Sequence, residues 1–270
     1  MAQTLSDIKR LLAEHGLRPK KKFGQNFLHD GNHLAKILQA AVLAPGDLVL
    51  EVGPGTGALT ERLVEAGARV VAVEIDTDLK PILEQRVGDQ VAVHFGDALS
   101  GKHAINPEVL ALLDGPFKLI ANLPYNVASP LIANLALDHP AMSHAVVMVQ
   151  KEVADRLVAP PGNKQYGTLG VLAQAIFEVH RVCTLSPGCF YPPPTIDSSV
   201  VAMARRDRPL CDDPHALSRL LQTLFSKRRK QIGSILGRDQ VLPPGVSADQ
   251  RPEQLTVEQL CSLTRRFTSG

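Results

Sequence analysis

A glycine-rich segment, Gly53-Pro54-Gly55-Thr56-Gly57, has the residue types of a ligand-binding loop. It directly follows an apolar run, Leu48 to Val52, that is typical of a buried strand. At the carboxyl end of a parallel strand, glycines allow a tight turn and let a ligand approach the backbone closely. Glu74 ends the next apolar run, 21 residues after Gly53, where a carboxylate can accept hydrogen bonds from both hydroxyls of a ribose. These residues predict a nucleoside-containing ligand.

The glycine loop by itself does not choose between two such ligands. The spacing Gly53-x-Gly55-x-x-Ala58 fits the NAD fingerprint, and S-adenosylmethionine (AdoMet) carries the same ribose. Asp97 follows the third apolar run and adds a second carboxylate to the same rim. Acidic groups suit the cationic sulfonium of AdoMet better than a pyrophosphate, which binds amides and cations. We therefore expect AdoMet, with Gly53, Gly55, Glu74 and Asp97 among its contacts.

The tetrapeptide Asn122-Leu123-Pro124-Tyr125 ends the fourth apolar run, which in an open α/β sheet faces the ligand crevice. The exocyclic nitrogen of adenine is a poor nucleophile because its lone pair is delocalised into the ring. The Asn122 side-chain oxygen and a carbonyl fixed by Pro124 can accept hydrogen bonds from this amino group, which favours a pyramidal nitrogen. Tyr125 offers a flat face on which an unstacked base gains about 1–3 kcal/mol. The tetrapeptide thus predicts methyl transfer to an adenine amino group without a strong base.

Short apolar runs that alternate with helical patterns must position these residues. Leu59 and Leu63, for example, lie at helical spacing between the first two runs. Strands of four or five apolar residues separated by helices are typical of a parallel sheet covered on both faces. A helix is also expected to begin at Ser129-Pro130. The predicted strands are Leu48 to Val52, Val70 to Val73, Val91 to Phe95, Leu119 to Ala121 and Ala145 to Val149.

A different pattern begins near Arg205. Asp213 followed by Pro214 is a typical helix start, and an amphipathic pattern follows it. A last helix is expected from Thr256 to Phe267, and no strand-like run follows Val200 to Met203. We therefore predict an α/β domain in residues 1–204 and a small, all-helical domain in residues 205–270.

The charge of the chain is unevenly distributed. Its 29 Lys and Arg and 27 Asp and Glu give a formal net charge of +2, which excludes a strongly basic, histone-like protein. Residues 205–270 hold 12 Lys and Arg against 7 Asp and Glu, a charge of +5, so the preceding residues carry −3. Two clusters of cations are expected to contact RNA phosphates. They comprise Lys20, Lys21 and Lys22, with Arg18 nearby, and Lys227, Arg228, Arg229 and Lys230 within a helical pattern.

Four cysteines, Cys183, Cys189, Cys211 and Cys261, form no CxxC pair. This spacing predicts unpaired thiols of a reducing compartment, with no disulfide or zinc framework and no bound metal. No segment approaches the roughly 20 apolar residues of a membrane span, and the N-terminal residues do not have the pattern of a signal peptide. We expect a cytoplasmic protein.

Taken together, these motifs carry a resemblance to one family. From about Lys20 to Lys230, the chain resembles the small-subunit rRNA adenine N6,N6-dimethyltransferases of the KsgA type. A conservative departure is Pro194-Thr195-Ile196, where the family more often has P-x-V. The motifs that match, in order, are Lys22-Phe23-Gly24-Gln25-Asn26-Phe27-Leu28, the Glu51 to Gly57 loop, Glu74, Gly96-Asp97, Asn122-Leu123-Pro124-Tyr125-Asn126, Gln150-Lys151-Glu152-Val153-Ala154-Asp155-Arg156 and Phe190-Tyr191-Pro192-Pro193-Pro194-Thr195-Ile196-Asp197-Ser198.

The resemblance implies a Rossmann-like, AdoMet-dependent methyltransferase sheet with a small helical C-terminal domain that binds RNA. It implies dimethylation of two adjacent adenines near the 3′ end of 16S rRNA in the assembling 30S subunit, with a role in ribosome biogenesis. By the resemblance, Asn26, Leu28 and Asn122 join the AdoMet contacts, and Phe190 stacks on the target adenine opposite Tyr125. A monomer that takes AdoMet as cofactor and pre-30S rRNA as partner is expected.

Three alternatives stay open at this point. An Erm-type 23S rRNA dimethyltransferase shares the loop and the tetrapeptide, although Gln150 to Arg156 and Tyr191 to Ser198 are more similar to the KsgA type. An NAD(P)-dependent oxidoreductase fits the glycine loop, but no Tyr-x-x-x-Lys arrangement supports it. The third is a non-catalytic assembly factor that binds the pre-30S particle, against which the intact tetrapeptide argues.

Overall fold

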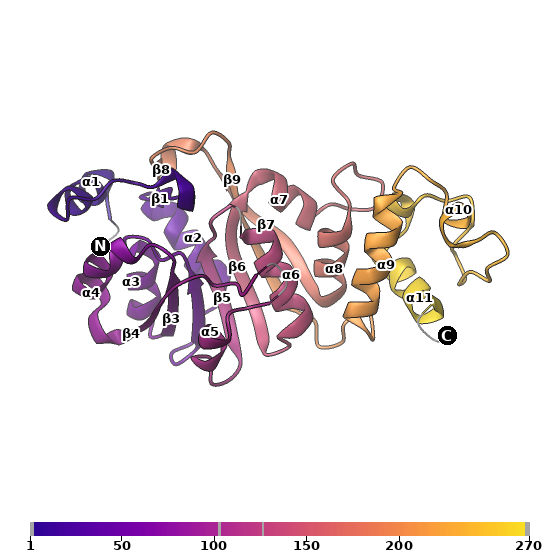
Figure 1. Ribbon diagram of the computed structural model, residues 1–270, viewed down its shortest axis with the longest axis horizontal. Coiled ribbons are helices and arrows are strands. Elements are labelled where there is room, and N and C mark those ends of the chain that lie inside the picture. Colours follow the sequence, from indigo (N-terminus) through magenta and orange to yellow (C-terminus); the bar gives the residue numbers. More distant parts are fainter. Residues whose placement is uncertain (1–2, 102–103, 126, 268–270) are drawn as a thin grey trace. The chain divides into compact units, whose positions relative to one another are not determined.

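The computed structural model describes residues 3–101, 104–125 and 127–267, so that Asn126 of the predicted motif lies outside it (Figure 1). Its strands are β1 (Phe27–Leu28), β2 (Leu48–Val52), β3 (Arg69–Glu74), β4 (Val91–Phe95), β5 (Phe117–Asn122), β6 (Met142–Gln150), β7 (Phe177–Leu185), β8 (Phe190–Tyr191) and β9 (Ser198–Arg205). Its α-helices are α1 (Leu5–Glu14), α2 (Gly31–Ala41), α3 (Ala58–Glu65), α4 (Lys80–Val87), α5 (Pro107–Ala111), α6 (Ala128–Asp138), α7 (Lys151–Leu157), α8 (Thr168–Ile176), α9 (Pro214–Ser226), α10 (Ile232–Leu236) and α11 (Val257–Phe267).

The larger of two sheets has seven strands in the order β4-β3-β2-β5-β6-β9-β7. β2 pairs in parallel with β3 and β5, β3 pairs in parallel with β4, and β5 with β6. All residues of β2 are buried, as expected for a strand that is covered on both faces. The predicted α/β fold with a parallel sheet is confirmed. β2 and β4 begin and end at the predicted residues, and the other three predicted strands extend one to three residues further at each end.

The order of the strands reverses at β2. The chain advances from β2 to β3 and β4 on one side of the sheet and then returns to β5, which pairs with the other side of β2. In open α/β sheets, ligands bind at such a switch point, in the crevice at the carboxyl ends of the strands. The glycine loop directly follows β2, and Asn122 is the last residue of β5. The two segments that the sequence singled out therefore start from adjacent strands.

Contacts divide the chain into two compact units, one of residues 1–151 and 180–203 and the other of residues 152–179 and 204–270. In the second unit α8, α9 and α11 pack on one another. The sequence placed residues 152–179 with the sheet. They group with the helical unit because α8 is buried on almost every side and packs against α9. Of the boundaries between the units, the one after residue 203 lies one residue before the boundary expected after residue 204.

Smaller differences from the sequence prediction concern the ends of elements. Asp213 caps α9 as predicted, because its carboxylate accepts a hydrogen bond from the Ala216 amide at 2.9 Å. The prediction that α6 begins with Ser129 as its cap was wrong, since the helix begins at Ala128 and has no side-chain cap. α9 ends at Ser226, so the cations at 227–230 lie in the turn after the helix instead of within it.

Of the four strands outside the list of predicted strands, β9 contains the strand-like run Val200 to Met203. The other three were not predicted, for two reasons. Most residues of β7 are only half-buried or exposed, so that its apolar signal is weak. β1 and β8 have two residues each and form a separate antiparallel sheet. Such short strands carry no periodic pattern and exist because two distant segments pair.

Two further features concern the cysteines and the helices. Cys183, Cys189, Cys211 and Cys261 are free thiols, as predicted. Across the described ranges, none of the helices combines the length and the apolar composition that crossing a membrane requires.

Candidate active site

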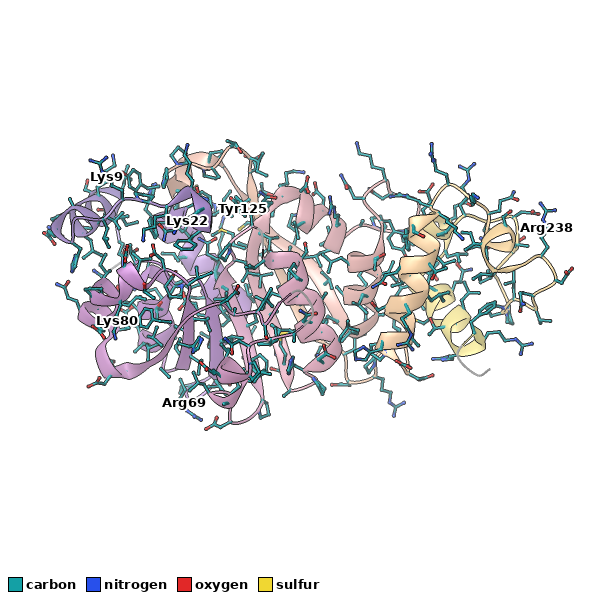
Figure 2. All side chains as sticks on the ribbon, viewed as in Figure 1. Lys9, Lys22, Arg69, Lys80, Tyr125 and Arg238 are labelled. Atoms are coloured by element: carbon teal, nitrogen blue, oxygen red, sulfur yellow. The ribbon has the colours of Figure 1, made fainter. Side chains whose placement is uncertain are left out.

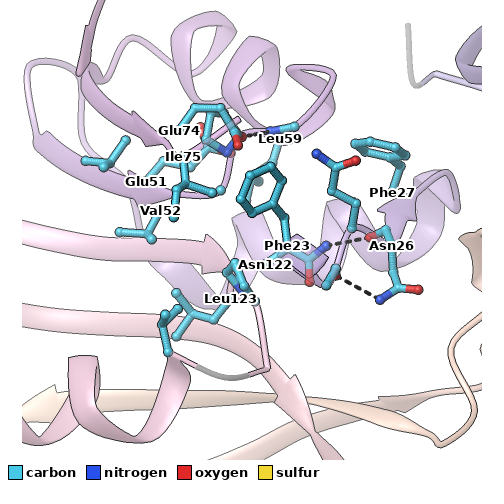
Figure 3. Close-up of a pocket in the computed structure, with 18 of the residues that line it drawn as sticks. Phe23, Asn26, Phe27, Glu51, Val52, Leu59, Glu74, Ile75, Asn122 and Leu123 are labelled. Atoms are coloured by element: carbon cyan, nitrogen blue, oxygen red, sulfur yellow. Dashed lines mark hydrogen bonds between the residues drawn. The ribbon is translucent and has the colours of Figure 1, made fainter. Parts of the chain in front are cut away.

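A pocket lies at the switch point, where β2 and β5 end (Figure 3). Its lining comes from the loops after β2, β3, β4 and β5 and from the segment that leads into β1. The charged residues of this lining, within the part of the chain that the structure describes, are Glu51, Glu74 and Asp97, and no Lys, Arg or His joins them. The pocket therefore suits a neutral or cationic ligand and offers a pyrophosphate no side-chain cation.

The glycine loop adopts the tight turn that the sequence predicted. Gly53, Gly55 and Gly57 have φ angles of 78°, 59° and 81°, in the left-handed region that favours glycine. A Cβ atom on Gly53 would lie 3.3 Å from Cδ of Pro124, and one on Gly55 would lie 3.0 Å from the Phe27 ring. Gly53 and Gly55 are thus packed closely against the Asn122–Tyr125 turn and the Phe27 ring of β1, where a side chain would crowd its neighbours.

Glu74 holds this loop from the end of the neighbouring strand. The residue is 4% exposed, and its Oε2 accepts a hydrogen bond from the Gly55 amide at 3.1 Å while Oε1 accepts one from the Asp76 amide at 2.9 Å. Burial raises the pKa of Glu74, and these backbone donors offset part of the rise. Each carboxylate oxygen has two lone pairs, so that both can still accept a hydrogen bond from a ligand hydroxyl.

Glu51, in β2, is a second buried acid of the pocket wall. The residue is 1% exposed, and its Oε2 has no hydrogen-bond partner among the described residues. Burial, together with the nearby Glu74 charge, raises the pKa of Glu51 to about 8. The carboxyl group is therefore mostly protonated at neutral pH. A cationic ligand in the pocket would favour its ionised form.

Asn122, Pro124 and Tyr125 all line the pocket. The Asn122 side chain donates a hydrogen bond from Nδ2 to the carbonyl oxygen of Asn26 at 3.2 Å (Figure 3). This leaves Oδ1 as the amide atom that can accept a hydrogen bond in the pocket. The Tyr125 hydroxyl is hydrogen-bonded to the Ser198 hydroxyl at 2.9 Å, which orients the ring, and burial raises the pKa of Tyr125.

The segment that leads into β1 contributes Asn26 and Leu28 to the lining. A buried acid fixes this segment to the end of β3. The Asp76 carboxylate accepts a hydrogen bond from Lys20 Nζ at 2.6 Å and another from Gln25 Nε2 at 2.7 Å. Since Asp76 is itself buried, these two bonds are shielded from water and hold the segment firmly at the pocket.

Phe190 is absent from the pocket lining that the structure describes. The residue is 3% exposed, and in the small sheet it pairs with Leu28. It belongs to the hydrophobic core of the first unit. Stacking of this ring on a base, as the resemblance implies, therefore requires Phe190 to move out of the core.

The predicted phosphate-binding cations fall into two groups, of which the first is exposed. Lys22 projects from the segment before β1, and its ammonium lies 4.6 Å from the centroid of the Phe23 ring, a residue of the pocket lining (Figure 2). The exposed cations are Lys21, Lys22, Lys227, Arg229 and Lys230.

The second group, Lys20 and Arg228, forms bonds within the protein. Lys20 binds the carboxylates of Asp76, as described above, and of Asp78, and these hydrogen bonds raise its pKa. Arg228 pairs with Glu253 and donates to the carbonyl oxygens of Lys164 at 2.6 Å and Asn163 at 3.0 Å. Arg228 thereby ties the turn after α9 to the loop before α8, within the second unit.

Sequence reasoning missed several residues of the site. Gln3 forms two hydrogen bonds with Thr56 of the glycine loop. Its Nε2 donates to the Thr56 carbonyl oxygen at 2.9 Å, and its Oε1 accepts from the Thr56 hydroxyl at 2.8 Å. Phe23 lines the pocket and Ser198 orients Tyr125. Phe23 and Ser198 both fall within motifs of the resemblance, and these motifs were the signal that could have identified them. No sequence pattern connects Gln3 with a residue 53 positions away.

Comparisons with known proteins agree on one family. The family model described as ribosomal RNA adenine dimethylase matches residues 16–269. The ribosomal RNA small subunit methyltransferase A of Syntrophotalea carbinolica is 42% identical over 261 residues, which cover 92% of this chain and 96% of that protein. The protein of the same name from Thermotoga maritima is 37% identical over 258 residues, which cover 95% of this chain and 88% of that protein.

Two solved structures are similar over most of the chain. A dimethyladenosine transferase from Plasmodium falciparum has a TM-score of 0.76 and 27% identity, covering 90% of this chain and 98% of that one. The 23S rRNA methyltransferase ErmE has a TM-score of 0.68 and 27% identity, covering 90% of this chain and 100% of that one. The alternative of an oxidoreductase finds no support in these relatives.

We expect Gly55→Ala to destabilise the first unit, because alanine is strained at a φ of 59° and its Cβ would contact Phe27. The left-handed conformation alone costs about 1–2 kcal/mol. Gly16→Ala is the matched control, since Gly16 has a φ of 65° and open space around it. Urea unfolding should give a larger loss for Gly55→Ala than for Gly16→Ala. Equal losses of unfolding free energy in the two variants would mean that the Phe27 ring moves aside without a free-energy cost.

Glu51→Gln should stabilise the protein at neutral and alkaline pH. The folded-state pKa of about 8 lies above the ordinary 4.5, so the stabilising contribution of the neutral carboxyl is complete below pH 4.5 and is lost as the pH rises through 8. Glutamine is neutral at every pH. The gain in unfolding free energy over the wild type should therefore increase across this range, by at most about 1.4 kcal/mol per pH unit.

Thermal unfolding at a series of pH values measures this gain. The control is Glu65→Gln, at an exposed position, which should show no such trend. A gain for Glu51→Gln that does not change with pH would contradict a raised pKa at this site.

Proposed function

Because the chain belongs to the ribosomal RNA adenine dimethylase family, we propose that it transfers methyl groups from AdoMet to the N6 amino groups of two adjacent adenines near the 3′ end of 16S rRNA. Relatives at 37–42% identity are named ribosomal RNA small subunit methyltransferase A, which favours this substrate over the 23S rRNA in the name of ErmE. The observation that carries the proposal is the pocket at the switch point, whose described lining holds three acids and no cation beside Asn122, Pro124 and Tyr125.

AdoMet fits the pocket by charge and by hydrogen bonding. When bound, it supplies a methyl group activated by a positively charged sulfur. The Glu74 oxygens retain lone pairs for the ribose hydroxyls, and Asp97 is exposed at the rim, where it can accept a hydrogen bond from an adenine amino group. Gly53 and Gly55 allow the ligand to approach the backbone. We assign the remaining contacts to Asn26, Leu28 and Asn122.

The target adenine would lie against the Asn122–Tyr125 turn. Oδ1 of Asn122 and the Leu123 carbonyl, whose direction Pro124 fixes, would accept the two hydrogen bonds of the N6 amino group and hold the nitrogen pyramidal. The proton on N6 becomes acidic as the methyl group transfers, so it can leave to water without a strong base. Tyr125 would stack on the base for about 1–3 kcal/mol. The pocket must also admit N6-methyladenine, because each adenine receives two methyl groups.

RNA binding is assigned to the exposed cations. Lys21 and Lys22 precede the pocket segment, and Lys227, Arg229 and Lys230 lie in the turn after α9. Exposed lysines and arginines gain affinity for phosphates by releasing counterions. Lys20 and Arg228 are positioning residues in this proposal, because their donors are already bound within the protein. The first unit would thus bind AdoMet, and both units would contribute to RNA binding.

The proposed partner is 16S rRNA within the assembling 30S subunit, which gives the protein a role in ribosome biogenesis. An adenine near the 3′ end can enter the pocket only while it is unstacked and single-stranded, which an incomplete particle permits. Because that substrate is a ribosomal precursor, we place the activity in the cytoplasm. We further propose that the protein acts as a monomer.

Asn122→Ala should keep the affinity for AdoMet within several-fold and lose most of the turnover, because the variant lacks the oxygen that orients N6. Transfer of labelled methyl groups from AdoMet to 30S precursors measures turnover, and nucleoside mass spectrometry identifies N6,N6-dimethyladenosine. The wild type should label 30S precursors and leave 50S precursors unlabelled.

The control is Asn32→Ala, which removes an exposed asparagine on α2 and should keep full activity. Full activity of Asn122→Ala would contradict the role assigned to its side chain. Labelling of 50S precursors by the wild type would instead support an Erm-type specificity.

Double variants should separate the two groups of cations. Replacing Lys227 and Arg229 by Gln should weaken binding to 30S precursors and reduce its salt dependence, by about one unit of slope for each phosphate that is no longer neutralised. Arg228→Gln should instead lower the thermal stability, because it leaves Glu253 and two carbonyl groups without their donor. If the salt dependence of binding is unchanged in the double variant, this turn does not belong to the RNA-binding surface.

A further inference from the structure

Three side chains with metal-binding atoms meet at one end of the small β1–β8 sheet, where β1 ends and β8 begins. Nδ1 of His33 lies 3.1 Å from an Asp30 carboxylate oxygen, and Sγ of Cys189 lies 3.9 Å from the other Asp30 oxygen and 3.9 Å from Nδ1 of His33. Across the ranges that the structure describes, this is the one group of three such residues whose ligand atoms all lie within 4.8 Å of one another.

Two distant segments form this cluster, and the backbone fixes both. Asp30 is the N-cap of α2, where its Oδ1 accepts hydrogen bonds from the Asn32 and His33 amides. His33 lies in the first turn of the same helix. Cys189 precedes β8, and its carbonyl accepts a hydrogen bond from the His29 amide at 3.1 Å, next to the β1–β8 pairing. The backbone therefore holds the three residues close to one another before any ion arrives.

We propose that Asp30, His33 and Cys189 form a zinc site. Sulfur, imidazole nitrogen and carboxylate oxygen are the ligands that Zn²⁺ binds, at about 2.3, 2.0–2.1 and 2.0–2.2 Å. In a tetrahedral site, bonds of these lengths separate the ligand atoms by roughly 3.3–3.6 Å. The separations of Sγ from His33 Nδ1 and from Asp30 Oδ2, both 3.9 Å, exceed those values by a few tenths of an ångström. The 3.1 Å contact of Nδ1 is with the other oxygen, Oδ1, so the carboxylate would have to turn slightly for one oxygen to serve as the ligand.

Charge and accessibility agree with this assignment. Zinc binding converts the Cys189 thiol to a thiolate, whose proton leaves to water, and takes the His33 tautomer that carries its proton on Nε2, so that Nδ1 is free to bind the ion. Thiolate, carboxylate and ion together are then neutral. Cys189 is 9% exposed, whereas the His33 and Asp30 side chains are 18% and 31% exposed. The thiolate is thus shielded within the protein, while the more open side of the cluster admits the ion and a water molecule as the fourth ligand.

The effect of the ion would be structural. It would link the start of α2 to the residue before β8 and so fasten the small sheet at that end. Leu28 of that sheet lines the pocket, and Phe190 directly follows Cys189. Zinc would therefore make the wall of the pocket at β1 more rigid. This inference does not depend on the proposed methyl transfer.

Equilibrium binding of Zn²⁺ to the full chain, after removal of metal with a chelator, tests the proposal. Competition with a chromogenic chelator should give one equivalent of zinc per chain. Cys189→Ser and Asp30→Asn should each weaken binding by about tenfold or more, while Cys183→Ser, the matched control at a half-buried cysteine, should not. Asparagine can still cap α2, so that Asp30→Asn tests the ligand rather than the helix.

A second measurement begins with the wild type, which is unaffected by any folding defect of the variants. Replacement of zinc by Co²⁺ should produce a thiolate-to-cobalt charge-transfer band that is absent from Cys189→Ser. Failure to bind zinc, or cobalt binding without that band, would overturn the proposal. Retention of the band in Cys189→Ser would also overturn it, because the thiolate would then belong to another cysteine such as Cys211 or Cys261.

Discussion

The candidate site depends on the two parallel ladders that hold β2 between β3 and β5. Backbone pairing sets Leu50 opposite Val71 on one side and opposite Leu119 on the other. In a parallel sheet, a common register brings the carboxyl ends of the strands to one edge, so that the glycine loop, Glu74 and Asn122 all begin there. Gly53, Glu74 and Asn122 are 21 to 69 positions apart in the sequence, and only the ladders bring them together. The other residues of the pocket lining surround this edge.

The pocket keeps acids where a stable protein core would have apolar residues. Glu51 and Glu74 are almost fully buried, and the raised pKa values of both express the free-energy cost of holding a carboxylate away from water. Two backbone amides offset part of this cost at Glu74. No comparable donor reaches Oε2 of Glu51 within the described residues. A cationic ligand would offset the charge of these carboxylates, so the same groups that cost folding free energy favour AdoMet over a pyrophosphate-containing cofactor.

The cations illustrate how far residue type predicts a role. No sequence pattern distinguishes the role of Lys20 from that of Lys22, or the role of Arg228 from that of Arg229. In the structure Lys20 and Arg228 bind acids and carbonyl groups of the protein, whereas Lys22 and Arg229 are exposed. Hydrogen-bond partners from distant segments decide the difference, and these are not encoded near either residue. Phe190 is a similar case, because its pairing with Leu28 places the ring in the core.

The sequence by itself determined the parallel sheet, the ends of β2 and β4, the glycine turn and the chemical class of the ligand. These depend on periodicity, on the conformational freedom of glycine and on side-chain charge, all of which are local properties. Only the tertiary structure decided that residues 152–179 join the helical unit, that Gln3 binds Thr56, and that Cys189 lies beside Asp30 and His33. The spacing of the cysteines gave no sign of a metal site, because its other ligands lie more than 150 residues away. Contacts over such separations follow from the packing of the whole chain, which no short pattern records.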